Sequence, residues 1–83
     1  MKKIIDGLFL LDSSPSSHVF IINEEKRIMI DTGLPSSTSD ILKELHNYNI
    51  DKIDALLLTH HDVDHVGGAL KIQKEMNAAI YIS

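Results

Sequence analysis

The chain has 83 residues, 43% of them hydrophobic, which is typical of a small globular unit with one core. No apolar run approaches the roughly 20 residues that a membrane-spanning helix needs, and the eight Lys and Arg residues are scattered within a net charge of −4, which argues against nucleic acid as a partner. The chain contains no cysteine, which excludes disulfides and thiolate metal ligands and makes a cytoplasmic location the expectation.

The first half of the chain is predicted to consist of strands and turns. Apolar residues at 4–5 and 8–11 flank Asp6-Gly7, a dipeptide that favours tight turns. The next segment, residues 12–17, has the composition of a polar loop. Residues 18–31 contain two apolar runs around a polar turn, so they are predicted to form a hairpin.

The second half is predicted to alternate helices with strands. An amphipathic helix starts near Ser37 or Ser39, either of which could cap it, and stops at Asn49. A buried strand follows over residues 52–58, then a second amphipathic helix, and a last strand at 79–82. The apolar sides of the two helices comprise Ile41, Leu42, Leu45 and Tyr48 in the first, and Val66, Ala69, Ile72 and Met76 in the second.

The order of these elements predicts the fold class. Together with a strand at 27–31, the second half has the order β-α-β-α-β, which predicts an α/β (α+β) fold with parallel strands and right-handed crossovers. The last strand begins within a few residues of Ser83 and would leave a long open sheet edge. We therefore expect residues 1–83 to form a partial domain whose second half is absent.

The most informative stretch is residues 58–68, where five of the eleven residues are His or Asp. Imidazole and carboxylate groups are the ligands that hold zinc and similar divalent metals. The stretch follows a buried strand, where ligand sites of open α/β sheets are found, and an extended backbone would direct residues 60, 62 and 64 to one side. Gly67-Gly68 would let a helix start close to the metal. The predicted ligands are His60, Asp62, Asp64 and His65, with the adjacent His61 as a possible substitute.

Zinc is the expected metal, and the two carboxylates make manganese or iron possible as well. A bound metal would lower the pKa of water toward roughly 7 and supply hydroxide as a nucleophile.

Simpler interpretations exist for each motif taken alone. The His/Asp stretch could be an exposed polar loop, and Asp31-Thr32-Gly33 could be a turn or the Asp-Thr-Gly motif of aspartic proteases.

The two motifs together resemble a known family. Residues 59–68 read T-H-H-D-V-D-H-V-G-G and are similar to the T-H-x-H-x-D-H-x-G-G signature of the metallo-β-lactamase superfamily. Residues 30–33 resemble a second signature of this family, and the two occur in the expected order with a helix and a strand between them. The resemblance implies an αββα sandwich, of which this chain would be the N-terminal half, and a hydrolase site with one or two metals.

The resemblance also implies roles for individual residues. By position, His60 and residue 62 would bind the first metal, and Asp64 and His65 the second. Asp64 would also be the catalytic residue that orients the attacking water, while Asp31 and Thr59 would hold the motif loop in place by hydrogen bonds. The substrate would be a small molecule whose ester, thioester, lactone, amide or phosphodiester bond is attacked by metal-bound hydroxide.

Two departures from the family pattern leave alternatives open. Asp62 stands where the family usually has His, which keeps a competent ligand but alters the metal preference. No His or Asp follows His65, so each metal would have about two ligands from this chain, fewer than the three of a catalytic zinc site. The chain is interpreted as the N-terminal portion of a hydrolase. The alternatives are a non-catalytic remnant that binds metal weakly or self-associates, and one half of a two-chain enzyme.

Overall fold

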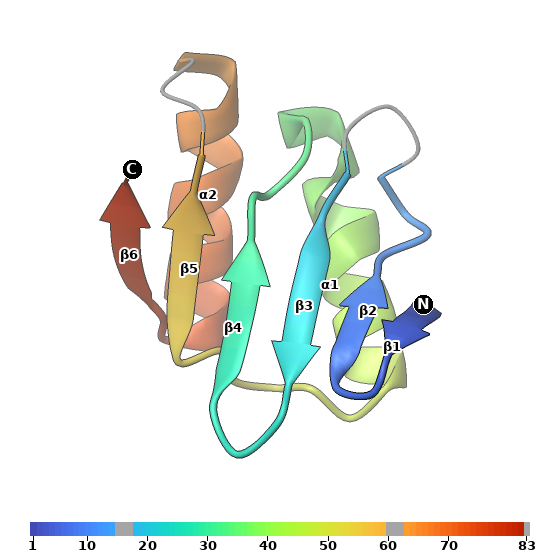
Figure 1. The fold of residues 1–83 in the computed structure, drawn as a ribbon. Coiled ribbons are helices and arrows are strands. Elements are labelled where there is room, and N and C mark those ends of the chain that lie inside the picture. The colour runs from blue at the N-terminus through green and yellow to red at the C-terminus, as the bar shows by residue number, and fades with distance from the viewer. Residues whose placement is uncertain (15–17, 60–62, 83) are drawn as a thin grey trace.

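The computed structural model describes residues 1–14, 18–59 and 63–82, without the side chains of residues 63–67. Its strands form one six-stranded sheet, in which each strand lies beside the one that precedes it in the chain (Figure 1). Strands β1 to β4 pair antiparallel, and β4, β5 and β6 pair parallel. The elements are β1 (Lys2–Ile5), β2 (Leu8–Leu10), β3 (Phe20–Asn23), β4 (Arg27–Ile30), the short 3-10 helix η1 (Pro35–Ser37), α1 (Thr38–Asn47), β5 (Ala55–Leu58), α2 (Val63–Met76) and β6 (Ala79–Ile82).

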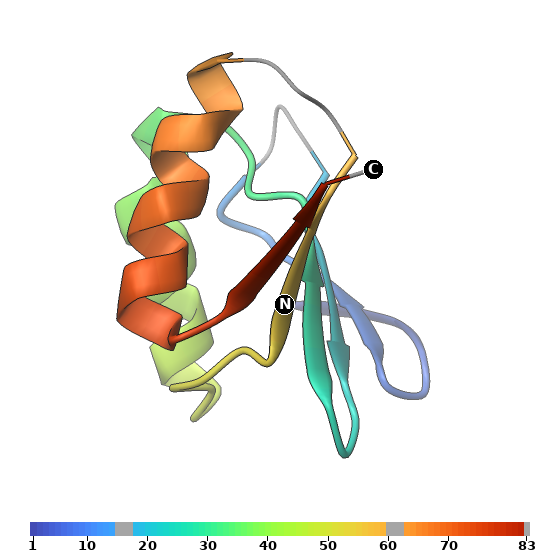
Figure 2. The ribbon, with the colours of Figure 1, turned by 90° about the vertical axis from the view of Figure 1, so that its left-hand side faces the viewer.

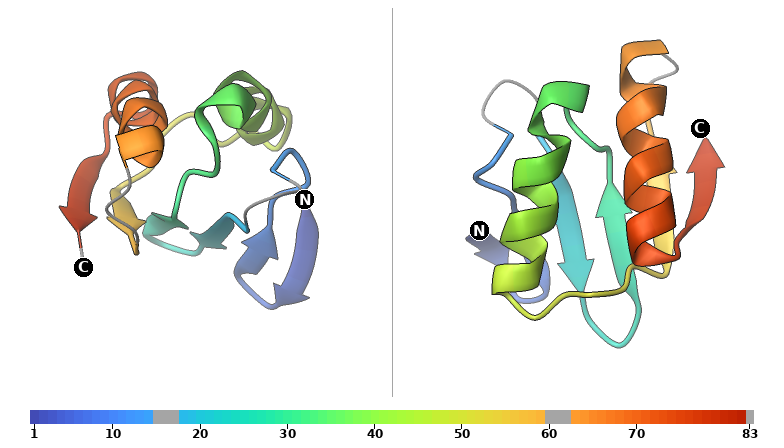
Figure 3. Two further views of the ribbon diagram at one scale, coloured as in Figure 1. Left: turned by 90° about the horizontal axis from the view of Figure 1, so that it is seen from above. Right: turned by 180° about the vertical axis from the view of Figure 1, so that it is seen from behind.

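The predicted α/β fold class is confirmed. Helix α1 connects β4 to β5, and α2 connects β5 to β6, so each pair of parallel strands is joined through a helix. Both helices cover the same face of the sheet, as the views from the side and from above show (Figures 2 and 3). Of the helices that the structure describes, none has both the length and the apolar character needed to cross a membrane.

The core lies between the sheet and the two helices. Residues 21, 29 and 56 are successive cross-strand partners in β3, β4 and β5, so their side chains share one face. The apolar stripes of the helices pack on this face, and each fully buried side chain of this kind stabilises the fold by about 1.5–3 kcal/mol. The side chains without exposed surface include Ile21, Met29 and Leu56 from the sheet, and Ile41, Leu45, Ile72 and Met76 from the helices.

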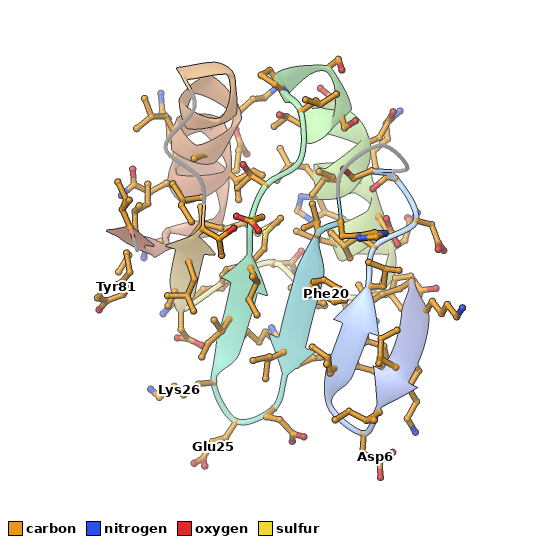
Figure 4. All side chains as sticks on the ribbon, turned by 45° about the horizontal axis from the view of Figure 1, so that its top comes forward. Asp6, Phe20, Glu25, Lys26 and Tyr81 are labelled. Atoms are coloured by element: carbon orange, nitrogen blue, oxygen red, sulfur yellow. The ribbon has the colours of Figure 1, made fainter. Side chains whose placement is uncertain are left out.

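The opposite face of the sheet carries no helix in the described part of the chain, yet it is also apolar. Phe20, Ile30, Leu57 and Tyr81 are successive cross-strand partners from β3 to β6 and therefore share this face. Leu57 and Tyr81 are 37% and 57% exposed, and Figure 4 labels Phe20 and Tyr81 on the sheet. The parallel part of this mixed sheet, β4 to β6, is thus apolar on both faces, which is characteristic of strands that are covered on both sides. The chain thus presents one α layer and one β layer.

Helix α2 differs from the sequence-based expectation at its start. It begins at Val63, so Gly67 and Gly68 lie inside the helix and do not precede it. The backbone at residue 64 is helical, and the extended alternation predicted for residues 60, 62 and 64 does not hold at the last of them. The expectation was wrong because a glycine pair is locally typical of a helix boundary, whereas Gly68 lies inside α2 and packs against the start of α1.

Helix α1 departs from the prediction in its N-cap and in the position of Tyr48, while its predicted stop is confirmed. Ser37 occupies the N-cap position, but its side chain makes no capping hydrogen bond, and Ser39 lies within the helix. Tyr48, predicted on the apolar side, is 51% exposed because the helix ends at Asn47 and Tyr48 belongs to the turn that follows. Asn49, with φ 61, adopts the left-handed conformation that commonly ends a helix, which confirms it as the stop.

Glu44 of α1 ties the helix to the loop after β2 and to the N-terminus. Its carboxylate accepts hydrogen bonds from the backbone N–H of Asp12 (3.0 Å), the N–H of Ser13 (3.0 Å) and the Ser13 hydroxyl (2.6 Å). The Met1 ammonium lies 2.9 Å from the same carboxylate. Burial alone would raise the pKa of Glu44, but these donors stabilise the charged form and lower the pKa to about 2.

This arrangement predicts a component of acid sensitivity. Because the pKa of Glu44 is about 2 when folded and 4.5 in the reference state, its stabilisation is fully present above about pH 4.5 and is lost as the pH falls toward 2. Glu44→Gln should flatten the decline of the free energy of unfolding across this interval, measured by urea unfolding at a series of pH values. Glu75→Gln, an exposed change on α2, should leave the slope as in the wild type. A Glu44→Gln profile parallel to that of the wild type would contradict this account.

Candidate metal site

The candidate site lies at the end of the sheet where the parallel strands β4 and β5 finish. Ile30 and Leu57 are register partners in these strands, and the Asp31 N–H donates to the Leu57 carbonyl at 2.8 Å. The N-terminal ends of α1 and α2 lie at this same end (Figure 1). The charged hairpin turns, with Asp6 and Glu25 labelled in Figure 4, lie at the other end. The strand ends and helix starts therefore frame one edge of the molecule, where open α/β sheets bind ligands.

Asp31 holds Thr59 by a compact set of hydrogen bonds. The Thr59 N–H donates to Asp31 Oδ1 at 2.9 Å, and the Thr59 hydroxyl lies 2.9 Å from Oδ1 and 2.7 Å from Oδ2. Hydrogen bonds to an ionised carboxylate are among the stronger ones in proteins. We call this contact the Asp31–Thr59 latch. It joins the end of β4 to the residue that directly precedes the His/Asp motif.

The backbone around Asp31 is tightly turned. Asp31 has φ 65 and Gly33 has φ 66, so both occupy the left-handed region. Aspartate tolerates this conformation better than most residues, and glycine adopts it without penalty. A side chain at Gly33 would collide with the Ser14 hydroxyl. The turn after β4 is therefore specified by Asp31 and Gly33 together, and it leads the chain directly from the sheet into η1.

The predicted metal ligands are only partly within the described structure. His60, Asp62 and the possible ligand His61 lie outside the described residues. The backbone of Asp64 and His65 forms the first turn of α2, and their side chains also lie outside the description. Among the side chains that the structure describes, no group of three or more His, Cys, Asp or Glu could hold a metal. The assignment of His60, Asp62, Asp64 and His65 stays a prediction.

The two remaining histidines make contacts of their own, and one of them is near this edge: His18 lies two residues before Phe20, which pairs with Ile30 at the end of β4. His46, on α1, pairs with Asp51 at 2.7 Å between Nδ1 and Oδ1 in an exposed position. His18 is exposed and its ring lies 6.1 Å, centre to centre, from the ring of Phe20. Neither contact involves Asp31 or Thr59.

One residue near the site was not found by sequence reasoning. Thr38, the first residue of α1, is 3% exposed and lies against α2 at Gly68. A single threonine at a predicted helix start carries no signal of such a contact, because capping threonines are common there. The contact between Thr38 and Gly68 is seen only in the structure, where α1 and α2 pack together.

Comparison with known proteins places the chain in a family. Residues 12–83 match the metallo-beta-lactamase superfamily. A UPF0173 metal-dependent hydrolase from Staphylothermus marinus is 39% identical over 56 residues, which cover 68% of this chain and 24% of that protein. Exodeoxyribonuclease YycJ from Bacillus anthracis is 24% identical over 72 residues, which cover 87% of this chain and 27% of that protein. A variant of a Cronobacter sakazakii metallo-beta-lactamase has a TM-score of 0.82 at 20% identity, covering 94% of this chain and 32% of that one.

These matches cover most of this chain but only a part of each matched protein. The chain spans about a quarter of the length of these two curated relatives, 27% of the exodeoxyribonuclease and 24% of the metal-dependent hydrolase. The likeness to the Cronobacter structure shows the shared fold, in agreement with the α/β class derived above. The family match runs over most of the chain and contains both the Asp31–Thr59 latch and the His/Asp motif. The chain therefore belongs to the metallo-β-lactamase superfamily.

Proposed function

We propose that this chain supplies the N-terminal part of a metal-dependent hydrolase site. The observation that carries the proposal is the Asp31–Thr59 latch, which holds the residue before the His/Asp motif at the carboxyl ends of β4 and β5. Helix α2 begins four residues after Thr59 and carries Asp64 and His65 in its first turn, so the latch and the helix hold the two segments that flank residues 60–62. Fixed flanking segments are suited to presenting several ligands to one point, as a metal site requires.

The donor set of the motif fits a divalent metal. His60, Asp62, Asp64 and His65 would hold it, and two imidazoles with two carboxylates are competent ligands for zinc. The carboxylate at position 62 raises the oxygen share of the set, which favours manganese or iron more than an all-histidine first site would. When bound, the metal acidifies a water molecule and polarises a substrate oxygen.

Residues of this chain would position the attacking water and the ligand motif. Asp64 would accept a hydrogen bond from the attacking water and direct it, while the Asp31–Thr59 latch keeps the motif backbone in position. The bond attacked would belong to an ester, thioester, lactone or amide, or to a phosphodiester. The relative named as an exodeoxyribonuclease supports including a phosphodiester among the first substrates to be tried.

A second candidate is a non-catalytic role for these 83 residues taken alone. It is favoured by two observations: no His or Asp follows His65, and the helix-free face of the sheet is apolar. On this alternative the chain binds metal weakly, self-associates, or pairs with a second chain that carries the remaining ligands. Catalysis would then require groups from outside residues 1–83.

Metal content tests the ligand assignment directly. The purified chain is expected to bind about one zinc ion, and Asp64→Ala should lose it, because removing one ligand of a small set lowers affinity severely. The measurement is elemental analysis after equilibration with zinc and gel filtration. Asp51→Ala is the matched control, since it removes an exposed aspartate that pairs with His46 and lies outside the motif. Equal metal content in the wild type and Asp64→Ala would contradict the assignment.

Activity tests the proposed reaction. In a protein that contains these residues together with the remaining ligands, Asp64→Ala and His65→Ala should each lower hydrolysis by at least about a hundredfold. The readouts are p-nitrophenyl esters and bis(p-nitrophenyl) phosphate, with Asp51→Ala as the control. Unchanged activity in both variants would rule out the proposed hydrolase site.

A further inference from the structure

Helix α2 rests on η1 and on the start of α1 through a glycine. A Cβ atom added to Gly68 would lie 2.9 Å from Thr38 Oγ1, 3.7 Å from Pro35 Cα and 4.0 Å from Thr32 Oγ1. A heavy-atom separation of 2.9 Å is too short for a carbon and an oxygen that are not hydrogen-bonded. No positive φ accounts for glycine here, because Gly68 is an interior residue of a regular helix. The close approach of the two helices is the reason that remains.

Thr38 is the residue that Gly68 meets most closely, and its side chain is buried. Thr38 is 3% exposed, and within the described residues its Oγ1 is buried without a hydrogen-bond partner. Burying an unpaired hydroxyl is unfavourable, so hydrogen bonding does not explain a threonine at this position. Its volume does, because the side chain fills the space between the start of α1 and the glycine surface of α2.

The contact is stiff. Threonine is β-branched, so rotation about χ1 largely exchanges the hydroxyl for the methyl group. A glycine inside a helix is less favourable than an alanine. The close packing at Gly68 is therefore kept although it lowers the helix propensity of α2. One turn further along α2, the Lys71 ammonium donates to Ser39 Oγ at 3.3 Å, so the two helices remain in contact beyond Gly68.

We propose that Thr38 and Gly68 form a spacer pair, which sets how closely the first turn of α2 approaches η1 and so positions the residues that this turn carries. Asp64 and His65 precede Gly68 by four and three residues, which is about one helical turn. Thr38 is then a positioning residue for the motif, although 26 positions separate it from Asp64 in the sequence. The inference rests on the proposed function in assigning a metal to those two residues.

The test is a set of substitutions on both sides of the contact, made in the 83-residue chain. Gly68→Ala should lower the Tm despite its better helix propensity and should shift the backbone amide resonances of residues 63–67. Thr38→Ala in the same chain should restore both, because it removes the obstructing atom. Thr38→Val should not restore them, since valine keeps the volume. With Gly68 intact, Thr38→Val should leave the Tm unchanged or raise it, because the hydroxyl that it removes has no partner in the part of the chain that the structure describes.

Several outcomes would overturn the spacer pair. Gly68→Ala with an unchanged Tm and unchanged amide resonances is one, and equal rescue by Thr38→Ala and Thr38→Val is another. Where Gly68→Ala alone does not fold, the double variant with Thr38→Ala decides: a wild-type-like spectrum supports the pair, and an unfolded double variant contradicts it. Leu70→Ala, an exposed change on the same helix, is the control and should leave residues 63–67 undisturbed.

Zinc titration, followed on the same amide resonances, separates this inference from the proposed function. Gly68→Ala should weaken zinc binding about tenfold and the double variant with Thr38→Ala should recover it, as expected when support for metal ligands is displaced and restored. If zinc moves no resonance in the wild type while the spacer effects are present, the metal assignment fails and the spacer pair stands. If zinc binds equally well to the wild type and Gly68→Ala, the positioning role fails and the metal assignment stands.

Discussion

Asp31→Ala is expected to lower the free energy of unfolding by about 2–4 kcal/mol, because it removes charge-assisted hydrogen bonds and places alanine in the left-handed region. Three contacts of 2.7–2.9 Å join the Asp31 carboxylate to Thr59, and all of them are lost in this variant. Thr59, which follows β5, then loses its side-chain bonds to the turn after β4, and the backbone bond from residue 31 to Leu57 remains. Zinc affinity should fall by about 10–100-fold for the same reason, since groups that hold a ligand loop contribute to metal affinity on this scale.

The matched variants separate the hydrogen bonds from the backbone effect. Asp31→Asn keeps one acceptor oxygen and tolerates φ 65, so it should lose less stability than Asp31→Ala. Thr59→Val removes the hydroxyl bonds but leaves the Thr59 N–H to donate to Asp31. In a double-mutant cycle measured by urea unfolding, Asp31→Ala and Thr59→Val should cost clearly less together than the sum of the two separately. Strict additivity would mean that the latch does not couple these residues.

Leu56→Ala is expected to have the largest effect on folding, a loss of about 2–5 kcal/mol. Leu56 has no exposed surface and lies in β5 between the register partners Met29 and Ile80, facing the two helices. A chain of this size has a total stability of about 4–12 kcal/mol, so the variant should lose a large share of it and, at the lower end of that range, should be largely unfolded. Chemical unfolding followed by far-UV circular dichroism measures the change.

Leu57→Ala is the control for this prediction. It truncates the same residue type in the same strand, but the side chain lies on the helix-free face and is 37% exposed. Its cost should be well below that of Leu56→Ala, since less apolar surface is removed from water on folding. Equal losses in the free energy of unfolding for Leu56→Ala and Leu57→Ala would show that the helix-free face is covered in solution. The stability would then depend on protein concentration, as self-association requires.

Much of the fold could be predicted from local sequence patterns. The alternation of apolar runs and turn dipeptides placed the hairpins, and helical spacing placed α1 and α2, because these periodicities are properties of single elements. The errors arose where tertiary contacts override local signals. Gly67-Gly68 read as a helix boundary but lies inside α2, where close approach to Thr38 requires a glycine. Tyr48 continued the apolar spacing but falls after the last turn of α1 and is exposed.

The ligand chemistry of the candidate site could be predicted from the sequence, but the contacts that hold the site together could not. Imidazole and carboxylate side chains concentrated after a buried strand indicate a metal whatever the surrounding fold. That Asp31 bonds both the N–H and the hydroxyl of Thr59 depends on the register of β4 against β5, which no local pattern specifies. The support of α2 by Thr38 depends in turn on how two helices pack on one face of the sheet.

By itself, the sequence determined the order and type of the elements, the class of the fold and the ligand chemistry of the motif, because each of these depends on residue type and short-range spacing. Only the tertiary structure decided which distant residues meet. Asp31 and Thr59 are 28 residues apart, and they come together because parallel pairing brings the carboxyl ends of β4 and β5 to one edge. Thr38 and Gly68 meet because both helices cover the same face, so that packing, and not spacing along the chain, selects a glycine there.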